Sequence, residues 1–225
     1  MDAIRAFVAI ELTKPIQEQL GQIIQQIQEH SPRAVRWVPP KNIHLTLKFL
    51  GNVSPTNLSN LIQVIKVEAL RHPMMQFCVG GFGAFPNRMR PRVIWVGVTA
   101  PPALLELQRG IDRETERLGY PSEDRDYSPH LTLGRVSQHA SPPEVRKVSD
   151  ALAGITIGEL GYVTVKEIIL FRSDLQTGGA VYSPLIAAPL RHLPHLVEES
   201  QPVVRSVPGQ VLSFVLESHQ TFITR

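Results

Sequence analysis

The tetrapeptide His-Leu-Thr-Leu occurs twice in this chain of 225 residues, as His44–Leu47 and as His130–Leu133. Histidine can donate or accept a proton near neutral pH, and a threonine hydroxyl can hydrogen-bond an anion. A repeat of these residues differs from a repeat of leucines, which every hydrophobic core requires. We therefore expect a site with twofold character, in which one imidazole gives a proton, the other takes one, and a phosphate lies between them.

Two imidazoles beside a phosphodiester suit general acid–base catalysis without a metal ion. One neutral ring would remove a proton from the attacking water, and one protonated ring would give a proton to the leaving oxygen. The hydroxyls of Thr46 and Thr132, with backbone N–H groups, would hold the nonbridging oxygens as negative charge develops. The residues alone do not distinguish which of His44 and His130 is the acid and which is the base.

A metal site is the main alternative use of the two histidines. Two histidines with no obvious companion carboxylate leave a zinc or iron site short of ligands. Asp124 and Asp126, which lie near His130 in the sequence, keep this alternative open. We expect no metal.

Each tetrapeptide lies in a segment whose composition predicts a β-strand. Side chains alternate across a strand, so His44, Thr46 and Lys48 are expected to share one face. His130 and Thr132 share a face in the same way. The residues on the opposite face of the first strand are expected to pack on helices; they are Ile43, Leu45, Leu47 and Phe49.

Apolar periodicity, capping residues and turn residues predict the other elements. Strands are expected at 3–12, 35–38, 43–50, 76–85, 93–99, 130–136, 163–172 and 180–190. Helices are expected after the cap Thr13 and over 54–71, 101–118 and 141–152. The fold class is therefore predicted as α+β, with two pseudo-symmetric lobes, each an antiparallel sheet backed by helices, and with the active-site cleft between them.

Length and composition fit one large domain or two small lobes, since 43% of the residues are hydrophobic. Residues 1–190 are predicted to form the two-lobed domain. Residues 191–225 are predicted to form a C-terminal extension of unknown role, with one more strand possible at 210–214.

Charge and cysteine usage restrict the class of protein. The net charge of +3 fits an enzyme with a local positive patch rather than a histone-like binder. The single cysteine, Cys78, excludes an internal disulfide framework and a cysteine-based zinc site, and it favours a reducing compartment. The first apolar stretch, 6–10, is too short for a signal peptide, and no apolar run approaches a membrane span. We expect a cytoplasmic monomer with no membrane partner.

At the two tetrapeptides the chain resembles the two-histidine (2H) phosphoesterase superfamily, whose mark is a pair of H-x-T-x motifs in two pseudo-symmetric lobes. More narrowly, it resembles the RNA 2′,3′-cyclic phosphodiesterase family, historically called 2′-5′ RNA ligase. The supporting segments are 5–10, 37–40, 42–51, 83–86, 90–97, 129–136, 170–175 and 178–182. Two mild departures are Tyr127, where phenylalanine is common, and Gly134, where alanine is frequent.

The resemblance implies the two-lobed fold and the hydrolysis of a terminal 2′,3′-cyclic phosphate of RNA to a 2′-phosphate, with no cofactor. It implies that His44 is the general acid that protonates the 3′ oxygen and that His130 is the general base that activates water. The substrate partner would be an RNA or a nucleotide with a 2′,3′-cyclic phosphate end. Three alternatives stay open: joining of RNA ends through 2′-5′ linkages, RNA binding without catalysis, and hydrolysis of a small nucleotide.

Basic residues near the motifs are candidates for contacts with the RNA backbone, although a run of charges is usually a solvated face. They are Lys48, Arg88, Arg90, Arg92 and Arg135, with Arg33, Arg36 and Lys41 before the first motif. Arg88, Arg90 and Arg92 lie on one predicted loop. Strict alternation turns Arg135 away from His130, so Arg135 contributes only if its strand ends or twists there.

Aromatic residues near the motifs are candidates for stacking on a terminal base. Tyr127 is the preferred one, and Phe85 is a second. Trp37 and Trp95 are expected to belong to the core instead.

Overall fold

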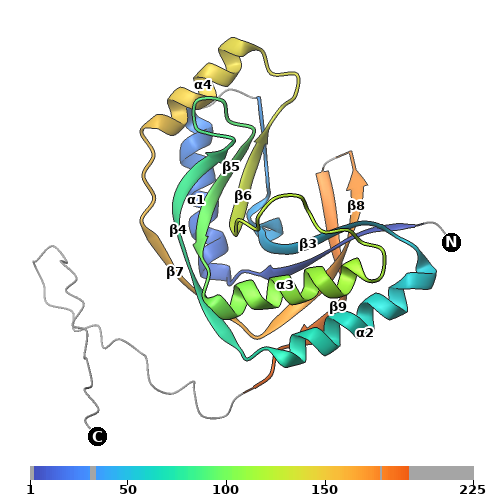
Figure 1. The fold of residues 1–225 in the computed structure, drawn as a ribbon. Coiled ribbons are helices and arrows are strands. Elements are labelled where there is room, and N and C mark those ends of the chain that lie inside the picture. Colours follow the sequence, from blue (N-terminus) through green and yellow to red (C-terminus); the bar gives the residue numbers. More distant parts are fainter. Residues whose placement is uncertain (1–2, 31–33, 178, 193–225) are drawn as a thin grey trace, which may run out of the picture. The chain divides into compact units, whose positions relative to one another are not determined.

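Apolar alternation and helix caps produce nine strands and four α-helices within the residues that the structure describes. This computed structural model describes residues 3–30, 34–177 and 179–192 (Figure 1). The elements are β1 Ile4–Glu11, α1 Lys14–His30, β2 Val35–Trp37, a 3₁₀ turn Pro40–Asn42, β3 His44–Val53, α2 Pro55–Arg71, β4 Met75–Phe85, β5 Val93–Thr99, α3 Pro102–Glu116, β6 His130–Val136, α4 Pro142–Ala153, β7 Glu159–Val165, β8 Glu167–Gln176 and β9 Gly179–Pro189. Arg33 and the possible strand at 210–214 lie outside the described residues.

Local capping explains where the helices after β3 and β6 begin. The Ser54 hydroxyl accepts a hydrogen bond from the Asn57 N–H at 3.3 Å, and Pro55 follows at the first helical position. Ser141 and Glu144 form a capping box at the start of α4. Both helices therefore start at the serine-proline pairs that the sequence predicts.

The strands form two antiparallel sheets, and the expected two-lobed α+β class is confirmed. The four-stranded sheet has the order β3-β1-β8-β9, and the five-stranded sheet has the order β2-β6-β5-β4-β7. Each sheet therefore combines strands from both halves of the chain. The similar order of elements in the two halves does not show this exchange, because strand pairing is set by packing in space.

The single strand expected at 163–172 is two strands, in different sheets. β7 ends at Val165 beside β4, and β8 begins at Glu167 beside β1. Both pieces are apolar, so composition gives no signal for the change of sheet at Lys166. β8 thereby joins β1 to β9 in the four-stranded sheet.

Helices cover one face of each sheet. α2 and α3 contact each other and the four-stranded sheet, while α1 contacts α4 and β7 of the five-stranded sheet (Figure 1). The main core lies between helices and sheets. The other face of the four-stranded sheet carries a second, smaller cluster of Phe7, Ala9, Ile169 and Phe171, with Tyr182 packed on it.

The last described residues still belong to this body. Arg191 forms a parallel bridge with Pro73, and its N–H donates to the His72 carbonyl at 2.8 Å. The remainder of the predicted extension, from residue 193 onward, lies outside the described residues. Among the described helices, none combines the length and the apolar character needed to cross a membrane.

Candidate active site

The two tetrapeptides lie on strands of different sheets that contact each other. β3 carries His44 and β6 carries His130, and Cα atoms of these strands come within 8 Å of each other. In both strands the histidine and threonine are partly exposed and the two leucines are buried. The two predicted half-sites therefore lie on adjoining segments of the fold.

The two imidazoles are held by matching hydrogen bonds. His44 Nδ1 lies 2.8 Å from the Asn42 carbonyl oxygen, and His130 Nδ1 lies 2.7 Å from the Ser128 carbonyl oxygen. A carbonyl oxygen can only accept, so Nδ1 carries the hydrogen in both rings. Each neutral ring therefore presents Nε2, with its free lone pair, for proton transfer.

Aromatic rings surround His44. Its ring stacks on Phe7 at 4.7 Å between centroids and meets the edge of Tyr182 at 5.2 Å. This burial lowers the pKa of His44 to about 4, against the opposing effect of the hydrogen bond to the Asn42 carbonyl. His44 is therefore neutral at pH 7 in the free protein.

His130 has a related setting on the five-stranded sheet. Its ring meets Phe85 edge-on at 5.0 Å and lies 6.5 Å from Trp95. Trp95 fits closely because it lies over Gly83, where an added Cβ atom would overlap the indole. Burial lowers the pKa of His130; the Ser128 carbonyl opposes this shift, while the charge of Arg135 reinforces it.

A β-bulge follows the threonine in both motifs. In the pairing of β1 with β3, Leu47 has no partner between Thr46 and Lys48. In the pairing of β5 with β6, Leu133 is passed over in the same way. One extra residue reverses the side-chain alternation beyond it. The two motifs therefore share a backbone bulge as well as a pattern of residues.

The bulge overturns the expectation that Lys48 shares the face of His44. Lys48 is only 3% exposed and points toward α3. Its Nζ donates to the Asp112 carboxylate and to the Pro121 carbonyl, the latter at 2.6 Å. Lys48 therefore ties β3 to α3 and to the loop that follows it, and it is not available to a phosphate.

The same bulges bring two other residues onto the histidine faces. Phe49, expected to pack on helices, is 53% exposed, and its ring lies 6.2 Å from the Phe7 ring that stacks on His44. Arg135, which strict alternation places on the opposite face, is exposed, and its charge lowers the pKa of His130. Both residues lie five positions after their histidine. Sequence alternation missed them because Leu-Thr-Leu carries no signal for a bulge.

Tyr127 has a different place from the one expected. Its ring packs against the main core, and its hydroxyl donates to the Thr46 carbonyl at 3.0 Å. Burial raises the pKa of the Tyr127 hydroxyl, which keeps it protonated as a donor. The expectation of a free stacking ring is therefore wrong.

Lys48 and Tyr127 together fasten the 117–129 loop to β3. Lys48 holds the Pro121 carbonyl, and Tyr127 binds the backbone at Thr46. Ser128, the next residue, accepts the hydrogen bond that orients His130. One loop therefore joins the strand of the first motif to the imidazole of the second.

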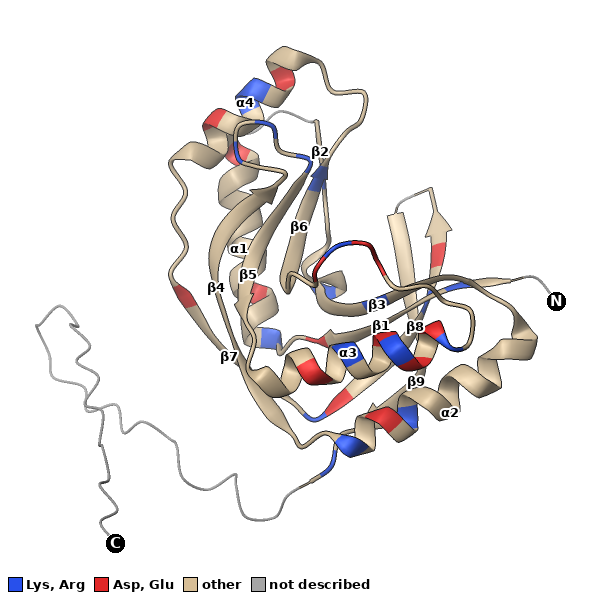
Figure 2. Cartoon of the chain, viewed as in Figure 1, with Lys and Arg blue, Asp and Glu red and all other residues tan. Residues whose placement is uncertain are grey.

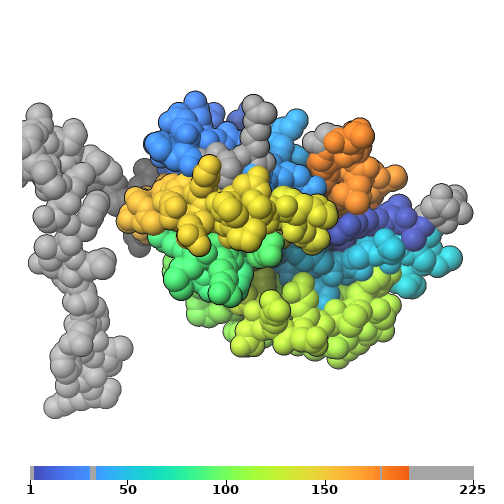
Figure 3. Space-filling model, turned by 90° about the horizontal axis from the view of Figure 1, so that it is seen from above, coloured from blue at the N-terminus to red at the C-terminus, as the bar shows by residue number. Residues whose placement is uncertain are grey.

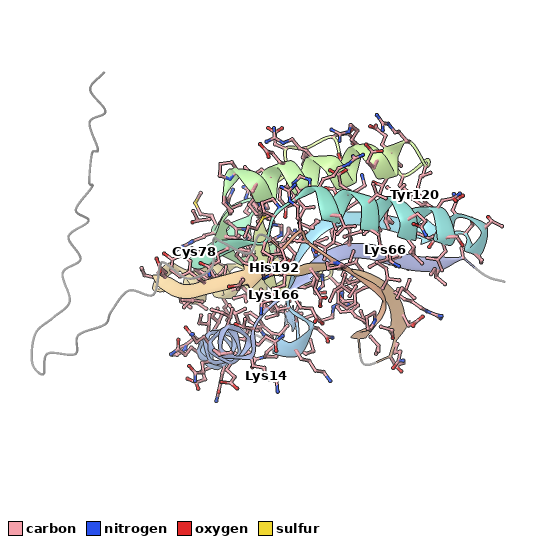
Figure 4. All side chains as sticks on the ribbon, turned by 90° about the horizontal axis from the view of Figure 1, so that it is seen from below. Lys14, Lys66, Cys78, Tyr120, Lys166 and His192 are labelled. Carbon is pink, nitrogen blue, oxygen red and sulfur yellow. The ribbon has the colours of Figure 1, made fainter. Side chains whose placement is uncertain are left out.

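Replacing Tyr127 by phenylalanine is expected to lower kcat by about three- to tenfold, because Ser128 and His130 lose a fixed support. The matched control is Tyr120→Phe, since Tyr120 lies near the start of the same loop and its hydroxyl accepts from Asn57 at 3.4 Å (Figure 4). The control should lose similar stability, about 1 kcal/mol, yet keep its turnover. Steady-state kinetics and thermal unfolding of both variants check this, and equal losses of turnover would contradict it.

The three arginines of the loop between β4 and β5 have different settings. The Arg88 guanidinium donates to the Phe82 and Ile155 carbonyls and lies 5.0 Å over the Phe82 ring, so it holds the loop instead of facing RNA. Arg90 and Arg92 are exposed. Arg90 and Arg92 therefore stay candidates for contacts with the RNA backbone, and Arg88 does not.

Basic residues occur on β2, on β6 and in the loop between β4 and β5 (Figure 2). Seen from above, this loop (green) and the segment after β6 (yellow) adjoin each other at the surface (Figure 3).

Across the described part of the chain, no three His, Cys, Asp or Glu side chains gather closely enough to hold a metal ion. Asp124 and Asp126 are exposed.

Named relatives align with most of this chain. An RNA 2′,3′-cyclic phosphodiesterase of Methanothermobacter thermautotrophicus is 33% identical over 182 residues, which cover 81% of this chain and 96% of the relative. A protein of the same name from Escherichia coli is 31% identical and covers 80% of this chain and 93% of its own length.

Solved structures show the same fold. TT0787 of Thermus thermophilus is 27% identical, with a TM-score of 0.70 over 84% of this chain and 98% of that chain. Escherichia coli LigT complexed with 3′-AMP is 29% identical, with a TM-score of 0.63 over 84% and 98%. The family model of the LigT-like phosphoesterases matches twice, at residues 10–95 and 96–182, so the chain belongs to that family.

Proposed function

We propose that this protein is an RNA 2′,3′-cyclic phosphodiesterase that hydrolyses a terminal 2′,3′-cyclic phosphate to a 2′-phosphate. One observation carries the proposal: two imidazoles on contacting strands of the two sheets, each oriented by a carbonyl two residues earlier, present the same nitrogen for proton transfer. The names of the relatives at 30–33% identity support the same activity.

The proposed step is an attack of water on phosphorus. His130 Nε2 takes a proton from the water, the new P–O bond forms, and the bond from phosphorus to the 3′ oxygen breaks. His44, protonated at Nε2, gives its proton to the leaving 3′ oxygen. The product carries a 2′-phosphate and a free 3′ hydroxyl, and His44 ends neutral while His130 ends protonated. This order of roles follows the family resemblance.

The bound substrate itself changes the protonation state of the two imidazoles. In the free protein burial keeps both rings neutral at pH 7, because it lowers both pKa values. A phosphate anion beside the imidazoles raises their pKa values and so favours a protonated His44. Thr46 and Thr132 would bind the nonbridging oxygens, and Arg135 would balance their growing charge. Phe49, exposed on the face of His44, would give a nucleobase an apolar surface.

The pH dependence of kcat/KM is expected to be bell-shaped, with its maximum on the acidic side of neutrality. Toward low pH both rings become protonated and no base remains, because His44 takes up its proton at about pH 4 and burial keeps the pKa of His130 below the ordinary imidazole value. Above the ordinary imidazole pKa of about 6.5 both rings are neutral and no acid remains. The profile of kcat should lie at higher pH, since bound phosphate raises both pKa values. Kinetics from pH 3.5 to 9 test this, and a flat profile would speak against two titrating imidazoles.

The proposed activity is tested with a short RNA that ends in a 2′,3′-cyclic phosphate. The expected product is the 2′-phosphate, identified by mass and by chromatography against 2′- and 3′-phosphate standards. Recovery of intact substrate, or of the 3′-phosphate, would refute the proposal.

We further propose that the catalytic domain ends close to residue 190 and that the protein acts as a cytoplasmic monomer. The single cysteine, Cys78, supports this location, because a chain without disulfides suits a reducing compartment.

A further inference from the structure

We propose that Asn42 is a positioning residue for His44, and that it acts by fastening the turn before β3 to the hairpin formed by β8 and β9. The inference rests on the proposed function, because it names the support of the imidazole that is assigned there as the acid. Asn42 itself touches neither the substrate nor the reacting atoms.

Asn42 is hydrogen-bonded through both its backbone and its side chain. Its N–H donates to the Pro39 carbonyl at 2.8 Å, which closes the 3₁₀ turn, and its own carbonyl accepts from His44 Nδ1 at 2.8 Å. Its side-chain Nδ2 donates to the Ala180 carbonyl at 3.2 Å. A carbonyl oxygen only accepts, so the NH₂ group of the amide must be the end that faces Ala180. Any movement of residue 42 therefore moves the partner of the imidazole.

The hydrogen bond from Asn42 to Ala180 connects opposite edges of the four-stranded sheet. β3 and β9 are the outermost strands of this sheet, and Asn42 lies two residues before the first residue of β3. Strand pairing keeps β3 and β9 apart, since β1 and β8 lie between them. The asparagine amide therefore fixes the turn to a hairpin that the strand ladder does not bring to it.

The same end of β9 also contacts the imidazole itself. Tyr182 comes two residues after Ala180, and its ring lies nearly perpendicular to the rings of His44 and Phe7, at 5.2 and 5.0 Å between centroids. The hairpin thus acts on His44 through the Tyr182 ring and through the carbonyl that Asn42 holds. Loss of the Asn42 amide would leave the ring contacts in place and release the hydrogen bond that orients Nδ1.

The second motif has a counterpart of this arrangement. The Tyr127 hydroxyl donates to the Thr46 carbonyl, and the next residue, Ser128, accepts from His130 Nδ1. In both motifs a side chain shortly before the histidine reaches a backbone carbonyl that is distant in the sequence. Each imidazole therefore has its own long-range support, and Asn42 provides the one for His44.

Asn42→Ala is expected to lower kcat on an RNA 2′,3′-cyclic phosphate by about tenfold and to change KM by less than about threefold, because a displaced proton carrier slows the chemical step and leaves binding intact. Asn42→Leu keeps the volume of the side chain without its donor, so it should lose a similar factor. The matched control is Asn57→Ala, which removes another partly buried amide, a donor to the Tyr120 hydroxyl at 3.4 Å, and should keep the wild-type kcat.

Nitrogen-15 NMR of the imidazoles at pH 8 gives a readout that a purely structural role would not move. Both rings of the free wild type should carry the hydrogen on Nδ1. Asn42→Ala and Asn42→Leu should shift the signals of His44 toward a mixture of tautomers and leave those of His130 unchanged. Circular dichroism should show native folding for all variants.

An unchanged His44 tautomer in both Asn42 variants would overturn the proposal, and so would a loss of kcat no greater than that of Asn57→Ala. Absence of turnover in the wild type would instead refute the proposed function. The NMR measurement needs no substrate, so it decides the role of Asn42 in either case.

Discussion

Alanine in place of His44 or His130 is expected to lower kcat on an RNA 2′,3′-cyclic phosphate by about 100-fold or more, which is the usual contribution of a positioned proton carrier. The double variant should be little slower than either single one, because the two rings act in one step. RNA affinity should be largely kept, since neither ring is charged at pH 7 in the free protein.

Single-turnover kinetics and a binding titration with a non-hydrolysable end measure these effects. His139→Ala is the matched control, because His139 is exposed in a turn after β6 and should keep wild-type turnover. Full activity of either active-site variant would remove that imidazole from the mechanism.

Arg135→Met is expected to lower kcat by about 10- to 100-fold, because a donor to the developing negative charge is lost. The same variant should raise the pKa of His130, since the arginine charge lowers that pKa in the wild type. The acidic limb of the pH profile should therefore move to higher pH. A residue with a purely structural role would leave that limb in place.

The control for the loss of one positive charge is Arg146→Met on α4, which should keep the wild-type rate. Rates of all variants are compared per active molecule. Arg135→Lys should restore part of the rate, because it keeps the charge and loses the bidentate geometry. An unchanged rate for Arg135→Met would mean that the bulge at Leu133 has no part in catalysis.

The histidines and threonines of the candidate site could be picked out from the sequence as a repeat, and most strands and helices could be predicted as well. The reason is that a repeated histidine and threonine on alternating strands leave few interpretations, and the caps at Ser54 and Ser141 mark helix starts locally. The places of Lys48, Phe49 and Arg135 relative to the histidines could not be predicted, because a bulge inside a Leu-Thr-Leu strand has no distinctive residue.

Contacts between residues far apart in the sequence could not be predicted either. The bond from Tyr127 to Thr46 spans 81 positions, and its existence depends on how the loop after α3 folds back. The exchange of strands between the two halves has the same cause. Periodicity reports which face of a strand is apolar, and it does not report which strand lies beside it.

The exchange of strands has a consequence for synthesis on the ribosome. β1 emerges before its partner β8, which lies much later in the chain; Ala6 of β1 pairs with Arg172 of β8. Until β8 has been translated, one edge of β1 stays open and Phe7 lacks its Phe171 neighbour. Nascent chains that stall before Glu167 are therefore expected to be aggregation-prone and to depend on chaperones, although the finished domain is not.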